Sequence, residues 1–345
     1  MPQNQASFRK RRILAGIAIA ALALTAGAYF FVAGGPDRKP AGPPERVTLA
    51  CTTITDTALA VVAQVQGYAR EEGLEVTIRR HPYGKLALQE VLEGKADFAT
   101  VAETPVMFAI LKGQKIAIVA TIQSTNRVNA IVARRDRGID RVADLRGRKI
   151  AVTLGTTMDY FLDALLSTQG ISRKEVSLVD LPAEEIPAAL ARGDVDAGSL
   201  AHPYNVVAEK SLAGRGITFQ SRDIYTAIYN IVATQAFIGQ NPGKVVKLLR
   251  ALTRAEAFVS RYPAAAQKIV ADFCGLELPL VRDGWAGNNF GVTLDQSLLL
   301  ELENEARWAI RNRLTGGATK LPNYLDFIYL EGLTSVKPKA VNILK

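Results

Sequence analysis

A set of strands and helices that occurs twice in the same order constrains the fold of this chain more than any other feature. The first set is a strand at 46–52, a helix at 55–73, a strand at 74–83, a helix at 85–94 and a strand at 96–101. The second set is a strand within 145–157, a helix at 158–170, a strand at 176–182, a helix at 183–193 and a strand at 194–202. The strands are short apolar runs, and the helices have apolar residues at helical spacing. This alternation predicts parallel sheets covered by helices on both faces.

Two similar segments close the two sets. Residues 94–105 read GKADFATVAETP, and residues 193–204 read GDVDAGSLAHPY. In each segment we expect the glycine to close a helix, the aspartate to begin a buried strand, and that strand to lead into a polar loop. Gly-x-x-Asp is a common pattern, so chance is the alternative explanation. Because the flanking elements match in order, we interpret the segments as equivalent positions in two α/β lobes.

The N-terminus indicates export. Basic residues at 9–12 precede an uncharged apolar run at 13–33. Residues 1–35 therefore form either a cleaved signal peptide or a retained membrane anchor, and both alternatives stay open. Residues 36–45 are rich in glycine, proline and charge, as expected of a linker. The protein is thus predicted to be periplasmic or otherwise extracytoplasmic, with its folded part beginning near Arg46.

The remaining composition argues against two function classes. The net charge of +9 falls to +5 without the four basic residues at 9–12, and no dense basic stripe follows, so we expect no nucleic-acid partner. The two histidines, His81 and His202, and the two cysteines, Cys51 and Cys274, have no metal-site spacing, and no cofactor motif is present. We expect Cys51 in a buried strand, and a Cys51–Cys274 disulfide stays open.

Four loops are candidates for binding a small molecule, because ligands of open α/β sheets bind beyond the carboxyl ends of the strands. They span residues 52–56, 103–104, 155–158 and 202–205. Within them the candidate ligand-binding residues are Thr53, Thr55, Glu103, Thr104, Gly155, Thr156, Thr157, Met158, His202 and Tyr204.

The loop at 155–158 has the strongest physical argument. Gly155, Thr156 and Thr157 open a helix, where free backbone N–H groups and hydroxyls favour a sulfonate, carboxylate, nitrate or phosphate. The alternative is that the threonines only cap their own helix. Glu103 is expected either to pair with a ligand amine or to be solvated. His202 and Tyr204 are expected either to contact the ligand or to line the lobe surface.

The chain resembles the nitrate/sulfonate/taurine class of ABC-transporter substrate-binding proteins, which includes binders of thiamine-precursor pyrimidines. The resemblance runs from about residue 46 to the end, and its carriers are residues 94–105, 128–166, 191–204 and 241–270. Many relatives have a tryptophan and an acid where this chain has Ala201-His202. The resemblance therefore leaves open which solute is bound.

The resemblance implies a type II periplasmic-binding-protein fold with a ligand cleft between two lobes. Lobe 1 would comprise residues 46–130 and 234–345, and lobe 2 residues 131–233, with crossings near 127–134 and 229–236. It also implies that the turn at 155–157 and the loops at Thr53, Glu103 and His202 face the ligand. The protein would be a monomeric solute-binding protein that closes around its ligand and then docks on a membrane permease driven by a separate ATPase.

Two rival functions remain. The first is an enzyme related to thiamine-pyrimidine synthesis, for which a His202–Glu103 pair is the acid–base candidate in this sequence. The second is a membrane-anchored sensor that keeps the N-terminal segment. No Ser-His-Asp set, metal spacing, cysteine cluster or phosphate loop was found, so the sequence favours binding without catalysis.

Overall fold

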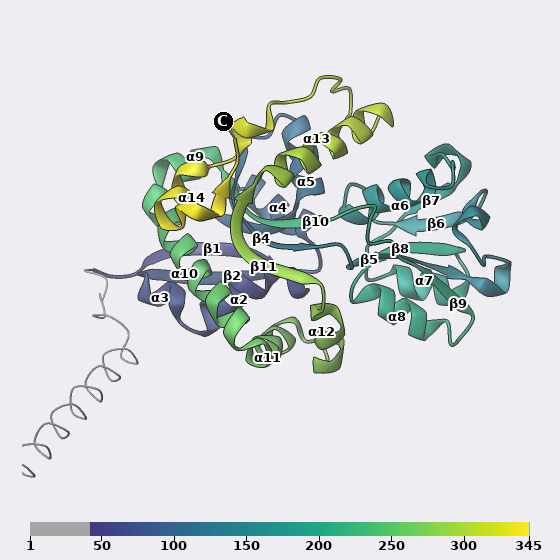
Figure 1. Ribbon diagram of the computed structural model, residues 1–345, viewed down its shortest axis with the longest axis horizontal. Helices are drawn as coiled ribbons and strands as arrows, with labels where there is room; N and C mark the ends of the chain where they lie inside the picture. The colour runs from purple at the N-terminus through teal and green to yellow at the C-terminus, as the bar shows by residue number, and fades with distance from the viewer. Residues whose placement is uncertain (1–41, 345) are drawn as a thin grey trace, which may run out of the picture. The chain divides into compact units, whose positions relative to one another are not determined.

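The structure, a computed structural model, describes residues 42–344 and builds them around two sheets (Figure 1). The larger sheet has the order β12 (Val341–Asn342), β11 (Asn288–Asp295), β4 (Ile116–Thr125), β10 (Ala227–Thr234), β3 (Phe98–Ala102), β1 (Glu45–Thr52) and β2 (Leu74–His81). The smaller sheet has the order β7 (Ser177–Asp180), β6 (Lys149–Val152), β8 (Ala197–Ala201), β5 (Asn129–Arg134) and β9 (Gly216–Phe219). The larger and smaller lobes below are these sheets with their helices.

The sheets are mixed, which corrects the expectation of parallel sheets. The strands β1, β2 and β3 are parallel, as are β6, β7 and β8, but β10 runs antiparallel to both β3 and β4. Likewise β5 runs antiparallel to β8 and β9. The chain leaves the larger sheet at β4 and returns at β10, so these neighbouring strands run in opposite directions.

The return strand begins earlier than the proposed lobe boundary. The chain passes between the sheets at 126–128 and 220–226, and β10 already belongs to the larger sheet from Ala227. The expected return crossing lay near 229–236, with lobe 1 resuming at residue 234. The lobe ranges 46–130, 131–233 and 234–345 stay a proposal. The boundary at 233/234 falls inside β10, which belongs to the larger sheet.

Helices cover the sheets in the order that the sequence predicts. The α-helices are α2 (Ala58–Val65), α3 (Tyr68–Glu71), α4 (Gly84–Leu92), α5 (Glu103–Leu111), α6 (Thr157–Ser167), α7 (Ile186–Arg192), α8 (Tyr204–Ser211), α9 (Gln235–Gln240), α10 (Pro242–Arg261), α11 (Pro263–Cys274), α12 (Leu278–Trp285), α13 (Gln296–Arg311) and α14 (Leu330–Val336). The 3-10 helices are η1 (Thr55–Thr57), η2 (Arg135–Arg137), η3 (Val142–Leu145), η4 (Arg173–Glu175), η5 (Tyr324–Phe327) and η6 (Pro338–Ala340).

The helix expected at 55–73 is divided into η1, α2 and α3. Gly67 has φ +76°, which interrupts the helix between α2 and α3. On the smaller sheet, Figure 1 shows α6 on one face and α7 and α8 on the other.

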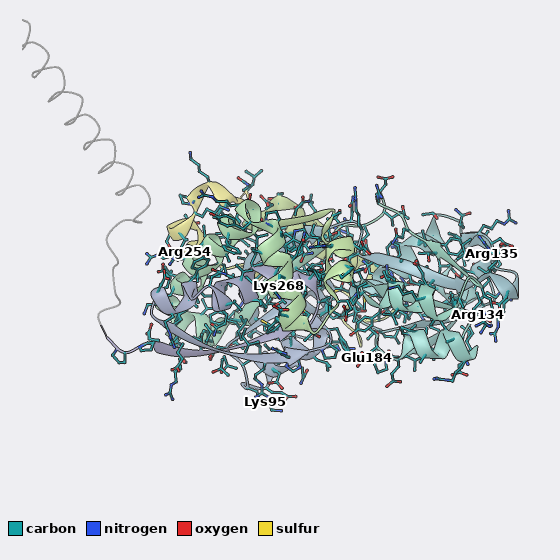
Figure 2. All side chains as sticks on the ribbon, turned by 90° about the horizontal axis from the view of Figure 1, so that it is seen from below. Lys95, Arg134, Arg135, Glu184, Arg254 and Lys268 are labelled. Atoms are coloured by element: carbon teal, nitrogen blue, oxygen red, sulfur yellow. The ribbon has the colours of Figure 1, made fainter. Side chains whose placement is uncertain are left out.

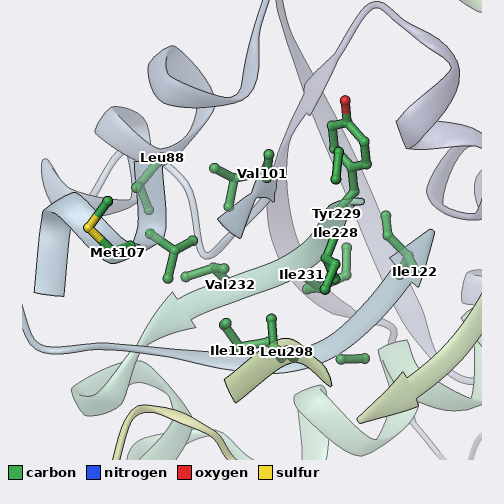
Figure 3. Close-up of a cluster of buried hydrophobic side chains, with 14 of the residues drawn as sticks. Leu88, Val101, Met107, Ile118, Ile122, Ile228, Tyr229, Ile231, Val232 and Leu298 are labelled. Atoms are coloured by element: carbon green, nitrogen blue, oxygen red, sulfur yellow. The ribbon is translucent and has the colours of Figure 1, made fainter. Parts of the chain in front are cut away.

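The central strands β4 and β10 carry the core of the larger lobe. Figure 3 shows Ile118 and Ile122 of β4 near Ile228, Ile231 and Val232 of β10. The helices α4, α5 and α13 add Leu88, Met107 and Leu298 to the same cluster. All eight side chains are buried, and each contributes about 2 kcal/mol of burial free energy. This core holds the carboxyl ends of β1 and β3 in fixed positions.

The N-terminal segment lies outside the described residues, whereas both cysteines lie within them. Residues 1–35, expected to be a signal peptide or anchor, and most of the expected linker lie outside the described residues. Among residues 42–344, no helix has the length and apolar composition needed to cross a membrane. Cys51 lies buried in β1 as predicted, and both Cys51 and Cys274 are free thiols.

Candidate functional site

A pocket between the two lobes gathers residues that are far apart in the sequence. Its lining from the larger lobe is Ile54, Asp56, Pro82, Tyr83, Gly84, Lys85, Ala102, Pro105 and Tyr229. Its lining from the smaller lobe is Thr156, Thr157, Met158, Ala183, Ala201, His202 and Tyr204. We call this the interlobe pocket. Five of the ten residues expected to bind a ligand line it, and all five come from the smaller lobe.

The N-terminus of α6 supplies the clearest anion-binding group in the interlobe pocket. Thr156 is the N-cap residue, but its hydroxyl donates to the carbonyl of Thr153 at 2.6 Å and does not cap the helix. The Thr157 hydroxyl lies 3.3 Å from the sulfur of Met158. Among the described residues, no group accepts a hydrogen bond from the backbone N–H of Thr156, Thr157 or Met158. These donors stand at the positive end of an eleven-residue helix.

Gly155 lies outside the interlobe pocket. Its backbone N–H donates to the Asp159 carboxylate at 2.9 Å, so it is not available to a ligand. Asp159 in turn pairs with Arg173 at 2.6 Å. Gly155 lines a separate groove of about 380 Å³, to which Arg173 and Phe108 also contribute. The backbone N–H groups of this turn that have no acceptor among the described residues are therefore those of residues 156–158, and that of Gly155 is not among them.

Asp56 of η1 is the acidic residue of the interlobe pocket. It lies in the expected loop 52–56 but is not among the residues expected to bind. Its side chain is only 2% exposed, one carboxylate oxygen accepts from the Thr52 hydroxyl, and the other has no partner among the described residues. Burial raises the pKa of Asp56 to about 7. Thr53 and Thr55 flank it without lining the pocket.

Tyr83 and Lys85, which are not among the residues expected to bind, also line the interlobe pocket. The Lys85 ammonium crosses to the smaller lobe and donates to the carbonyl of Leu154 at 2.9 Å. Burial, with Glu184 as the next cause, raises the pKa of Tyr83 and of Tyr204. Glu184 precedes α7 and is labelled in Figure 2. Tyr83 and Lys85 reach the pocket through tertiary packing, so no local pattern in the sequence marks these two residues.

His202 lines the interlobe pocket from the smaller lobe and contacts the larger one. Its Nε2 lies 2.9 Å from the carbonyl of Leu280 in α12, which fits an Nε2–H that donates to this oxygen. Burial lowers the pKa of His202, so the imidazole is neutral at pH 7. A Cβ at Gly284 would stand 2.5 Å from the ring, so α12 packs tightly against the histidine.

Glu103 and Thr104 lie outside the interlobe pocket. Glu103 is fully buried and accepts from the Tyr225 hydroxyl and from the backbone N–H of Ile228, at 2.8 Å for the latter. Burial raises the pKa of Glu103 to about 8. The Thr104 hydroxyl donates to Glu305, and α5 begins at Glu103 with Ala102 as its N-cap residue. Glu103 bonds Tyr225 and Ile228, and His202 bonds Leu280, so the two side chains do not form the pair considered from the sequence.

The interlobe pocket is small in this conformation. Its volume is about 40 Å³, enough for a few water molecules. Pockets that hold organic ligands have roughly 300 Å³ or more. An organic solute would therefore require the lobes to separate or the lining side chains to move. A hinge at the two strand connections, 126–128 and 220–226, would permit such a separation.

Comparisons with known proteins match a range of the chain that contains the whole interlobe pocket. The family model described as NMT1/THI5 like matches residues 54–266, a range that contains every residue lining the interlobe pocket. A putative aliphatic sulfonates-binding protein of Bacillus subtilis is 26% identical over 228 residues, or 65% of this chain and 68% of that protein. A putative thiamine biosynthesis protein of Haemophilus influenzae is 26% identical over 236 residues, or 67% of this chain and 74% of that protein.

A solved structure shows the same fold. The periplasmic aliphatic sulphonate binding protein of Escherichia coli superposes with a TM-score of 0.70 at 19% identity, covering 84% of this chain and 98% of that one. The present chain therefore has the two-lobed fold of periplasmic binding proteins, as its resemblance implied.

Proposed function

We propose that this chain, which belongs to the NMT1/THI5-like family, is an extracytoplasmic solute-binding protein of an ABC importer. It binds a small anionic or polar organic solute in the interlobe pocket, of the sulfonate, nitrate or taurine kind or a pyrimidine precursor. The observation that carries the proposal is the set of three unpartnered N–H donors at Thr156, Thr157 and Met158, which face a pocket that both lobes line.

The mechanism is closure around the ligand. A solute that contacts α6 of the smaller lobe and η1 of the larger lobe makes both sets of contacts only when the lobes are together, so it shifts the population toward the closed form. The closed monomer then docks on a membrane permease that a separate ATPase drives. The names of the sulfonate-binding relatives support this role.

Binding without catalysis is favoured over the enzyme alternative. The acid–base pair that the sequence suggested is not assembled, because Glu103 bonds Tyr225 and His202 bonds Leu280. The thiamine-related relative keeps a pyrimidine precursor among the candidate solutes. Recovery of the bound compound unchanged after incubation supports binding, whereas a chemically altered compound would establish the enzyme.

Export and the sensor alternative depend on residues 1–35. Mass spectrometry of the protein isolated from its cell envelope measures the mature N-terminus. Residues 26–28, Ala-Gly-Ala, fit the small-residue pattern before a signal-peptidase cleavage site. A terminus beyond residue 28 therefore supports a released binding protein, and an intact N-terminus supports an anchored one, as the sensor alternative requires.

A thermal-shift panel tests the proposed function most directly. The panel comprises taurine, alkanesulfonates, nitrate, bicarbonate, aromatic carboxylates and pyrimidine precursors. A ligand at one hundred times its dissociation constant adds about 2.7 kcal/mol of stability, or about 5 °C in Tm for a chain of this size. A shift for one class identifies the solute class, and no shift with any compound contradicts the proposal.

A further inference from the structure

The interlobe pocket contains a carboxylate, that of Asp56, with one oxygen that accepts no hydrogen bond from the described residues. Asp56 is 2% exposed, and one of its carboxylate oxygens receives no hydrogen bond from the described residues. Thr52 holds the other oxygen and so fixes the orientation of the carboxylate. A buried charge without a partner costs several kcal/mol, so a position of this kind needs an explanation.

The cationic side chain of the pocket is bonded elsewhere. Lys85 donates to the carbonyl of Leu154, and His202 is held by Leu280 in its neutral form. Three groups feel the charge of Asp56, namely Cys51 of β1, Cys274 of α11 and Tyr229 of β10. Tyr83 and Tyr204 line the same pocket. Burial raises the pKa of these thiols and phenols, so they stay neutral near pH 7. Two charged groups lie one step further away, Arg80 beside Cys274 and Glu184 beside the two tyrosines.

The two ends of the pocket therefore have opposite preferences. The N-terminus of α6 offers three N–H donors and the positive end of a helix dipole. Asp56 offers an acceptor oxygen and, when ionised, a negative charge. A simple anion would satisfy α6 but would leave Asp56 unpaired and would be repelled by it.

From this arrangement we propose that the solute is a small zwitterion, with its anionic group on residues 156–158 and a protonated amine that donates to the free oxygen of Asp56. This inference rests on the proposed function and narrows it to aminoalkanesulfonates and their amino-acid analogues. Asp56 is then the specificity-determining residue, because it distinguishes an aminated solute from the same anion without its amine. Charged hydrogen bonds of this kind are stronger than neutral ones.

Paired ligands test the inference on the whole protein. Calorimetry measures the affinity for 2-aminoethanesulfonate against ethanesulfonate, and for 3-aminopropanesulfonate against propanesulfonate. We expect the aminated member of at least one pair to bind at least tenfold more tightly. In Asp56→Asn, which keeps the acceptor for Thr52, we expect that preference to fall at least tenfold while the affinity for the plain sulfonate stays equal or rises.

The pH dependence supplies a second readout. Asp56 has a pKa of about 7, so its ionised fraction rises about tenfold between pH 6 and pH 8. An alkylamine stays protonated over this range. We therefore expect the preference for the aminated sulfonate to rise about tenfold from pH 6 to pH 8 in the natural protein and to stay constant in Asp56→Asn. Using the ratio within a pair cancels the effects of pH that act equally on both members, and Asp56→Asn isolates the contribution of Asp56.

Glu305→Gln is the matched control. Glu305 is also fully buried with one unpartnered carboxylate oxygen, but it does not line the interlobe pocket. Its variant should keep the preference within each pair, and thermal melting of both variants checks that they fold. Equal binding of both members, or a preference unchanged in Asp56→Asn, overturns the inference and leaves the proposed function standing. Failure of all four sulfonates to bind overturns the inference, whereas the full solute panel decides the proposed function.

Discussion

The residues that follow β3 and β8 occupy equivalent positions in the two lobes but make different contacts. Both strands are fully buried and end in alanine. The helix α5 begins directly after β3, whereas His202 and Pro203 separate β8 from α8. After β8, His202 and Tyr204 line the interlobe pocket. After β3, Glu103 and Thr104 turn into the protein interior, where they bond Tyr225 and Glu305.

The return strand β10 accounts for part of this difference. Its pairing with β3 extends from Val232 opposite Ala99 to Tyr229 opposite Ala102, the residue before Glu103. Tyr225 and Ile228, which precede Tyr229, donate to the Glu103 carboxyl through a hydroxyl and a backbone N–H. Beside β8 lies β5, and there the backbone N–H of His202 donates to the carbonyl of Val128 at 2.9 Å, while its ring reaches α12. The comparison teaches that similar local sequences can bond within one lobe in one place and line the pocket between the lobes in another.

The largest expected effect comes from removing the Glu103 carboxyl. Glu103→Ala leaves the Tyr225 hydroxyl and the Ile228 N–H without an acceptor, at a cost of about 3 kcal/mol in the free energy of unfolding. Urea denaturation measures this loss. A stability equal to that of the natural protein would mean that Glu103 is not the structural partner described above.

Glu103→Gln is the milder variant and reports the pH dependence. Because burial raises the pKa of Glu103 to about 8, the folded protein keeps a proton that the unfolded chain releases near its ordinary pKa. The stabilisation is complete at low pH and is lost as the pH rises toward 8. The natural protein should therefore lose stability between pH 5 and pH 8, and the glutamine variant should lose less.

The second prediction concerns the ligand side of the comparison. Thr157→Pro removes one N–H donor at the first residue of α6, a position that tolerates proline, and Thr156 before it is already extended at φ −125° and ψ 174°. We expect the affinity for the bound sulfonate to fall about thirtyfold, or about 2 kcal/mol, without loss of stability. Thr157→Ala keeps the N–H and is the control. Isothermal titration calorimetry measures both, and an equal loss in both variants would assign the effect to the hydroxyl.

The third prediction compares the glycines that begin the two similar segments. Gly94 and Gly193 both have positive φ, at +70° and +84°, so alanine at either should cost about 1 kcal/mol. A Cβ at Gly94 meets nothing within 4 Å, whereas one at Gly193 would lie 2.5 Å from Arg137 and 2.9 Å from Arg134, which Figure 2 labels. Gly193→Ala should therefore lose about 1 kcal/mol more than Gly94→Ala in thermal or urea unfolding. Equal losses would show that the arginines move aside without cost.

The smallest effect is expected at His202. Its lowered pKa means that the unfolded chain takes up a proton near pH 6.5 that the folded protein does not, so stability falls as the pH drops below 6.5. This slope is opposite in sign to that of Glu103. His202→Gln should remove it, with a change of about 1 kcal/mol or less in unfolding free energy at pH 7. Denaturant titrations at pH 5 and pH 7 measure the slope, which should persist in Glu103→Gln.

The sequence predicted most of the elements and part of the site. The strands and helices of both sets occur in the expected order because short apolar runs and helical spacing are local signals. Thr156, Thr157, Met158, His202 and Tyr204 line the interlobe pocket, while Thr53, Thr55, Glu103, Thr104 and Gly155 do not. Asp56, Tyr83, Lys85 and Tyr229 enter the lining from segments whose local pattern carries no sign of it.

By itself, the sequence determined that the chain forms two α/β units and that a helix opens within residues 155–158, because these properties depend on neighbouring residues. Only the tertiary structure decided the direction of β10, the burial of Glu103, the bond that occupies the Gly155 N–H and the unpartnered oxygen of Asp56. Most of these depend on contacts between residues far apart in the chain, such as Glu103 with Tyr225 or His202 with Leu280. Hydrogen bonding and burial act through space, and a polar side chain is free for a ligand only where the folded protein leaves it without a partner.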